Sequence, residues 1–235
     1  MKKPQGVLAL VAAMALLAAP AMATLVEDPW DPGSASDELN LYEIVNALYG
    51  TSFASSAAML SAQVAAPLDE VFSGGRSIVA TAHYASYVET FGWYQYTGMG
   101  DPTTLMELFS VETEGLGNLA SASISPVGDY GFYAQAGPAD EPDLYTWFSE
   151  SDENPHGEDH LVLYDLGLLV SSEYDGSYLM AWEDMPTCMS DQDYQDLVIE
   201  LNPGGDPPGV VPEPSSIMLL GLGVAGILVR RFRSA

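Results

Sequence analysis

The stretch SIVATAHYASYVETFGWYQY, residues 77–96, decides the fold class of this chain. It holds two short apolar and aromatic runs, and similar runs recur between Gly, Pro and Asp residues from position 75 to 201. β-Branched and aromatic residues favour strands, and short runs at this spacing without helical periodicity are typical of all-β folds. We therefore predict a mainly β fold, an antiparallel β-sandwich or jelly roll. The expected strands are residues 77–84, 91–96, 105–111, 120–125, 131–136, 144–148, 160–166, 177–183 and 197–201.

One or two helices are expected ahead of the strands, in a lead-in of residues 24–74. Four apolar residues recur at helical spacing: Leu41, Ile44, Val45 and Leu48. Ser36 is the expected N-cap of this helix and Gly50 its C-terminal glycine. A second, Ala-rich helix is expected over residues 54–66. The strands form a sandwich domain, residues 75–201, and a Pro/Gly-rich linker, residues 202–211, follows it.

Both ends of the chain carry export features. Lys2 and Lys3 precede an apolar run, and an Ala-x-Ala site ends at Ala23, which predicts a signal peptide of residues 1–23. At the other end, an apolar run from Ile217 to Val229 spans roughly 20 Å as a helix, against a bilayer core of ~30 Å. Flanking serines and snorkelling arginines extend it, so we predict a transmembrane helix over 215–229. The alternative is a buried helix of a soluble domain.

The C-terminal segment, residues 212–235, has three parts in a fixed order. They are the Pro-Glu-Pro tripeptide, the apolar run and an arginine cluster: Pro212, Glu213, Pro214, then Arg230, Arg231 and Arg233. This order resembles the PEP-CTERM sorting signal of Gram-negative bacteria. The resemblance implies a partner, the membrane transpeptidase exosortase, which cuts near Pro-Glu-Pro. It also implies a precursor anchored in the inner membrane and a product at the cell surface or in the extracellular matrix. A simple C-terminal anchor is the alternative.

The body between these ends, residues 24–211, is strongly acidic. It holds 32 acidic residues and a single base, Arg76. Such a body has no counter-charge for phosphates, which excludes binding to nucleic acid or to anionic membrane surfaces. The mutual repulsion requires screening by salt or by divalent cations. Two interpretations stay open, an acidic surface adapted to salt and specific calcium sites. The lone Cys188 cannot form an intrachain disulfide, and burial is expected for it.

Half of these carboxylates lie in residues 140–196. A strand that ends near 183, a loop and the next strand are expected to bring several of their oxygens together. Ca²⁺ takes 6–8 hard oxygen ligands, and it relieves the repulsion among them. The stretch is no EF-hand, because Asp196 stands where that loop needs glycine and Asn202 where it needs glutamate. The predicted calcium ligands are Glu183, Asp184, Asp191, Asp193 and Asp196. A solvated acidic loop is the alternative.

Residues 160–164, 178–185 and 191–199 resemble the bacterial domain of unknown function 4114. That family has a Glu-Asp-Leu turn, then Asp-x-Asp-Tyr-Asn-Asp and an apolar strand. Here Met185 replaces the Leu and Gln195 the Asn, though an amide oxygen can still coordinate a cation. The resemblance covers roughly residues 75–201. It implies a surface-associated β domain without assigned catalysis.

Catalytic motifs are absent from the sequence. There is no nucleophile elbow, P-loop or dinucleotide pattern, and His83, His156 and His160 lack zinc spacing. Carboxylate pairs of the kind used by glycoside hydrolases occur by chance in so acidic a chain. We therefore expect a non-catalytic, calcium-binding surface or matrix protein. The alternatives are an exopolysaccharide-binding module in adhesion or biofilm and, less favoured, a secreted glycoside hydrolase.

Overall fold

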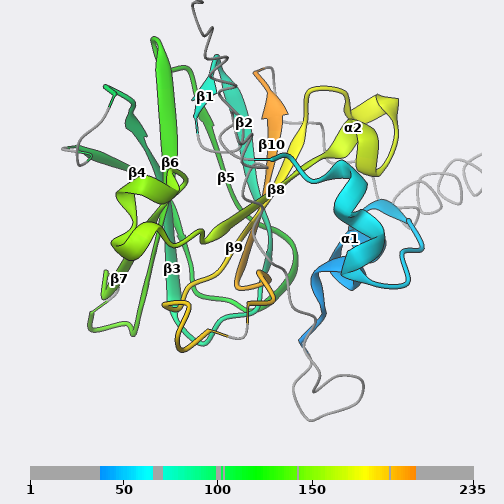
Figure 1. Cartoon of the computed structure of the whole chain (residues 1–235), viewed down its shortest axis with the longest axis horizontal. Helices are drawn as coiled ribbons and strands as arrows, with labels where there is room; N and C mark the ends of the chain where they lie inside the picture. Colours follow the sequence, from blue (N-terminus) through cyan, green and yellow to red (C-terminus); the bar gives the residue numbers. More distant parts are fainter. Residues whose placement is uncertain are drawn as a thin grey trace, which may run out of the picture.

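The computed structural model describes residues 38–65, 71–98, 102, 104–141, 143–190 and 192–204. Within these ranges, two five-stranded antiparallel sheets form the body (Figure 1). The first sheet has the order β5-β2-β10-β9-β8, and the second has the order β1-β6-β3-β4 with β7 also paired to β6. The strands are β1 Phe72–Ser73, β2 Arg76–His83, β3 Val88–Gln95, β4 Leu105–Val111, β5 Gly115–Ile124, β6 Asp129–Gly137, β7 Tyr145–Phe148, β8 Leu161–Asp165, β9 Tyr178–Trp182 and β10 Leu197–Pro203.

The predicted mainly β fold is confirmed, and each expected strand overlaps an observed one. The differences lie in the short strands and the boundaries. β1 was not expected, because two residues carry no alternation pattern. β5 begins at Gly115, well before the expected start at 120. Its first residues have low strand propensity, but Gly115 and Leu116 pair with β2, and a register shift separates them from the pairs that begin at Ala120. β10 runs through Pro203, two positions past its expected end.

The main core lies between the two sheets. Phe91 of β3 and Phe132 of β6 come from the second sheet, and Trp182 of β9 and Ile199 of β10 come from the first. The rings of Phe91 and Trp182 meet edge to face with their centroids 6.1 Å apart. All four side chains are fully buried, so burial of large apolar area between the sheets holds the sandwich together.

Helices cover the outer face of the first sheet. α1 spans Leu41–Tyr49, η1 is a 3-10 helix of Ser56–Ala62, and α2 spans Leu166–Leu169. Figure 1 shows α1 and α2 on the same side of the strands β8, β9 and β10. Their apolar residues form a second core with β2, β8, β9 and β10, which are therefore buried on both faces, whereas β5 at the sheet edge is partly exposed. Three further 3-10 turns are η2 Ser151–Glu153, η3 Pro155–Gly157 and η4 Ser172–Tyr174.

The N-terminus of α1 differs from the expectation. Asn40, not Ser36, is the N-cap, because the carboxylate of Glu43 accepts hydrogen bonds from the backbone N–H and the side-chain amide of Asn40, at 3.1 and 3.3 Å. Gly50 ends the helix in the left-handed conformation, with φ 67°, as predicted. The second expected helix is the shorter η1, a 3-10 helix rather than an α-helix over 54–66.

Asn40→Ala is expected to lower the free energy of unfolding by about 1 kcal/mol, the usual cost of losing an N-cap. The substitution removes the hydrogen bond from the side-chain amide to Glu43. Urea unfolding followed by circular dichroism measures the loss. Asn118→Ala on the exposed surface of β5 is the control and should change the value by less than about 0.5 kcal/mol. Equal effects of the two substitutions would contradict the role of the cap.

Several expectations concern residues outside the described ranges. These are the signal peptide over 1–23, the sorting residues from Pro212 to Arg233 and the transmembrane helix over 215–229. Among the helices that the structure does describe, none has the length and apolar character needed to span a bilayer.

Candidate metal centre

Three carboxylates meet at one end of the sandwich. Glu183 and Asp184 directly follow β9, and Asp196 directly precedes β10. Because β9 and β10 are antiparallel neighbours, with Trp182 opposite Leu197, these segments lie at the same sheet edge. One oxygen from each carboxylate lies within 4.8 Å of the other two. The backbone N–H of Asp184 also donates to Asp196 Oδ2 at 2.8 Å, which fixes the two strand ends relative to each other.

The cluster lines a cavity of about 260 Å³. Asp193 and Gln195 line the same cavity, and each is only 3% exposed. Gln195 Oε1 is buried and has no hydrogen-bond partner in the part of the chain that is described. The opposite wall comes from the loop after β2 and includes Tyr84 and Tyr87. The cavity therefore offers carboxylate and amide oxygens on one side.

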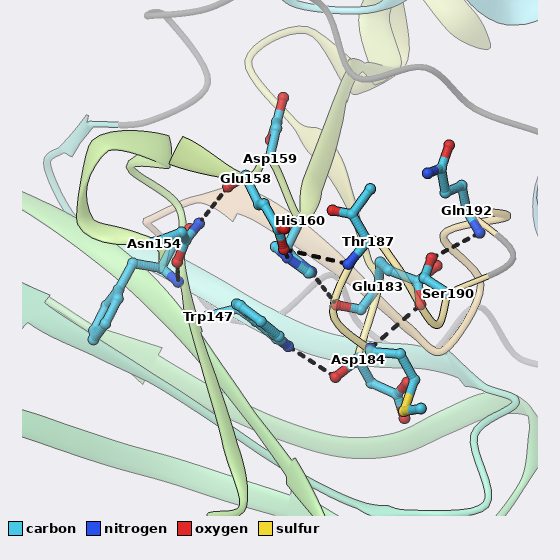
Figure 2. A network of polar contacts seen from close by, with 12 residues as sticks. Trp147, Asn154, Glu158, Asp159, His160, Glu183, Asp184, Thr187, Ser190 and Gln192 are labelled. Carbon is cyan, nitrogen blue, oxygen red and sulfur yellow. Dashed lines mark hydrogen bonds and ion pairs between the residues drawn. The ribbon is translucent and has the colours of Figure 1, made fainter. Parts of the chain in front are cut away.

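Two aromatic side chains hold the peptide of Glu183 and Asp184 in place. Trp147 Nε1 donates to the backbone carbonyl of Asp184 at 2.8 Å, and His160 Nδ1 lies 3.0 Å from that of Glu183. Figure 2 shows the Trp147 and His160 rings side by side, both turned toward this segment; the rings are stacked with centroids 3.6 Å apart. The backbone N–H of Glu183 donates to the carbonyl of His160 at 3.1 Å. The segment that carries Glu183 and Asp184 is therefore held by contacts with Trp147 on one strand and His160 before another.

The loop before β10 adopts an unusual backbone. Gln192 and Tyr194 have positive φ angles of 63° and 56°, a left-handed conformation that side chains with a Cβ rarely adopt. Tyr194 is buried, and its hydroxyl donates to the backbone carbonyl of Asp159 at 2.9 Å. Such strain persists only where the surrounding structure holds it, and it is concentrated at functional sites. Here the anchored loop carries Asp193 to the cavity.

The carboxyl groups of the cluster repel one another in their ionised form. Burial, followed by repulsion from Asp184, Glu183 and Asp193, raises the pKa of Asp196 well above its usual range. Burial and then Asp184 likewise raise the pKa of Glu89, a carboxyl on β3 that is fully enclosed. Among the described residues, no Arg or Lys side chain lies near these carboxylates to offset their negative charge. Arg76, the one Arg or Lys there, lies at the far end of β2 and donates to the carbonyl of Gly176.

The structure brings most of the predicted ligand residues together, while metal binding itself stays a prediction. Of the five predicted ligands, Glu183, Asp184 and Asp196 meet and Asp193 lines the same cavity, whereas Asp191 lies outside the described residues. Glu89 was missed. Its signal was a single acid at an inward position of an apolar strand, two residues before Phe91. The prediction of a buried Cys188 is wrong: that thiol is exposed, on the turn that follows the cluster.

Comparison with known proteins bears on the C-terminal end of the chain rather than on this cluster. Residues 210–234 match the PEP-CTERM protein-sorting motif. No curated protein and no solved structure matches the chain. The chain thus carries at its C-terminus a sorting motif that fits an exported protein processed by an exosortase-type membrane enzyme.

Proposed function

We propose that this protein is an exosortase-sorted component of the cell surface or extracellular matrix, and that its β body binds calcium without catalysing a reaction. The observation that carries the calcium assignment is a carboxylate cluster, two of its three members buried, with no Arg or Lys beside it among the described residues. A buried charge costs several kcal/mol unless a partner offsets it. Five acidic side chains line the cavity, Glu38 together with Glu183, Asp184, Asp193 and Asp196, and a divalent cation is the partner that they accommodate.

The donor set favours calcium over other cations. Oxygens bound to one Ca²⁺ at 2.3–2.6 Å are separated by at most roughly 5 Å, and the three cluster oxygens lie within 4.8 Å of one another. Zinc prefers nitrogen and sulfur ligands, and the imidazole of His160 turns its Nδ1 toward a backbone carbonyl. Gln195 Oε1 adds a neutral oxygen, which calcium accepts readily.

Calorimetric titration of the purified full-length chain is expected to show saturable calcium uptake, with a Kd of about 10⁻⁴–10⁻³ M as in extracellular modules. Asp196→Asn should weaken binding at least about tenfold, because the side chain can keep its bond from Asp184 N–H but loses the charge. Asp140→Asn removes the same charge from an exposed site and is the control. Equal weakening in both variants would mean nonspecific screening and would contradict the proposal.

The remaining parts of the proposal concern partners. Exosortase is supported by the sorting motif over residues 210–234. Exopolysaccharide binding, the absence of catalysis and the likeness of residues 75–201 to the domain of unknown function 4114 stay predictions from the sequence. The glycoside-hydrolase alternative requires one carboxyl as acid and a second as base or nucleophile. It is less favoured, because carboxylate pairs are expected by chance in so acidic a chain.

A further inference from the structure

The two sheets face each other directly at the cluster. Phe91 of β3 contacts Trp182 of β9 across the core. Two residues before Phe91 on the same face of β3 lies Glu89, and two residues after Trp182 lies Asp184. Because side chains two apart in a strand share a face, Glu89 points across the sandwich as Phe91 does. Its carboxyl group hydrogen-bonds to Asp184, so the second sheet also contributes an acid to this end.

The surroundings of Glu89 point to a missing partner. The side chain is 1% exposed, and Oε1 is buried with no hydrogen-bond partner in the described part of the chain. An enclosed carboxyl with an unsatisfied oxygen is costly, and the nearest charged groups, Asp184 and Glu183, are also acidic. Neighbouring oxygens in a calcium shell lie roughly 3 Å apart, the spacing of two hydrogen-bonded oxygens. Glu89 is thus next to Asp184, at the edge of the group formed by Glu183, Asp184 and Asp196.

We infer that Glu89 is a direct ligand of the calcium ion, so that the ion joins the two sheets of the sandwich. This inference rests on the proposed function. Glu183, Asp184 and Asp196 bind the ion from the first sheet, and Glu89 binds it from the second. Calcium then cross-links the two sheets at the end of the sandwich, where acidic side chains replace the apolar side chains of the core. The bound ion stabilises the packing of β3 against β9 as well as the loop before β10.

Glu89→Gln tests this inference in the full-length chain. The substitution keeps the shape of the side chain and removes its charge. In excess chelator the variant should melt no lower than the wild type, because one buried acid is removed from a repelling group. Calcium should bind at least about tenfold more weakly, and the rise in Tm caused by calcium should be largely lost. Glu112→Gln, an exposed acid just after β4, is the matched control and should respond to calcium as the wild type does.

A second measurement does not depend on how the glutamine packs. Terbium replaces calcium in such sites, and its luminescence decay in H₂O and D₂O counts the waters on the ion. Glu89→Ala should add at least one water relative to the wild type. If the wild type binds calcium but Glu89→Gln binds it equally well and the water count is unchanged, Glu89 is no ligand and the inference fails alone. If the wild type binds no calcium, the proposed function fails with it.

Discussion

Trp182→Ala is expected to lower the free energy of unfolding by about 3–5 kcal/mol, the largest loss we expect from one substitution. Trp182 is fully buried, and it packs in the core between the sheets against Phe91. Removing the indole leaves a cavity that β9, paired on both sides by β8 and β10, cannot collapse to fill. Since domains of this size are stable by only about 5–15 kcal/mol, the variant should be close to unfolding at room temperature.

Trp182→Phe separates packing from hydrogen bonding. Trp182 Nε1 is buried and has no hydrogen-bond partner within the described ranges, so phenylalanine loses no bond and keeps an aromatic ring. We expect a cost of about 1 kcal/mol, well below that of alanine. Urea unfolding with calcium and again in chelator measures both variants. A small loss for Trp182→Ala in both conditions would show that the contact between the sheets is not the main source of stability.

The fold was readable from the sequence because its strands are rich in β-branched and aromatic residues. The strands near Ile78, Phe91 and Leu163 have strong local propensity, and the structure places each of them in the core. The predicted strand boundaries differ from the observed ones where strand propensity is weak. Gly115–Ile124 is held in place by its pairing with β2, which is a long-range property, and its first half has the composition of a loop.

The carboxylate cluster could be predicted only for the residues that are close in sequence. Asp184 and Asp196 stand close to each other in the chain, so a turn between two strands was enough to bring them together. Glu89 lies far upstream, and its approach to Asp184 depends on how the second sheet packs on the first. No periodicity within one strand fixes the relative position of two sheets. The hydrogen bond from Trp147 of β7 to the acidic segment depends on the same packing, whereas His160 reaches that segment within the first sheet.

The metal-free protein is expected to lose stability as pH rises from about 5 to 8. Glu89 and Asp196 have folded-state pKa values raised well above the usual range, through burial and neighbouring acids. The folded state therefore holds protons that the unfolded state releases near pH 4. Stability falls as pH rises from there through the folded-state pKa values. Each such carboxyl contributes a fall of about 1.4 kcal/mol per pH unit while it is protonated in the folded state and ionised in the unfolded state.

Two histidines act in the opposite direction. Burial lowers the pKa of His83 and His160, so their contribution makes stability rise with pH below about pH 6.5.

Thermal melts in chelator at several pH values measure this dependence, and the double variant Glu89→Gln with Asp196→Asn isolates its source. Both proteins retain the two histidines and almost the whole negative surface, so those contributions cancel in the comparison. The double variant should lose much of the fall in Tm between pH 5 and 8. Saturating calcium should raise the Tm of the wild type most at high pH and so reduce its dependence on pH. The ion stabilises the ionised carboxylates and is displaced by protons at low pH. An equal pH slope in both proteins would assign the effect to general surface repulsion instead of the buried cluster.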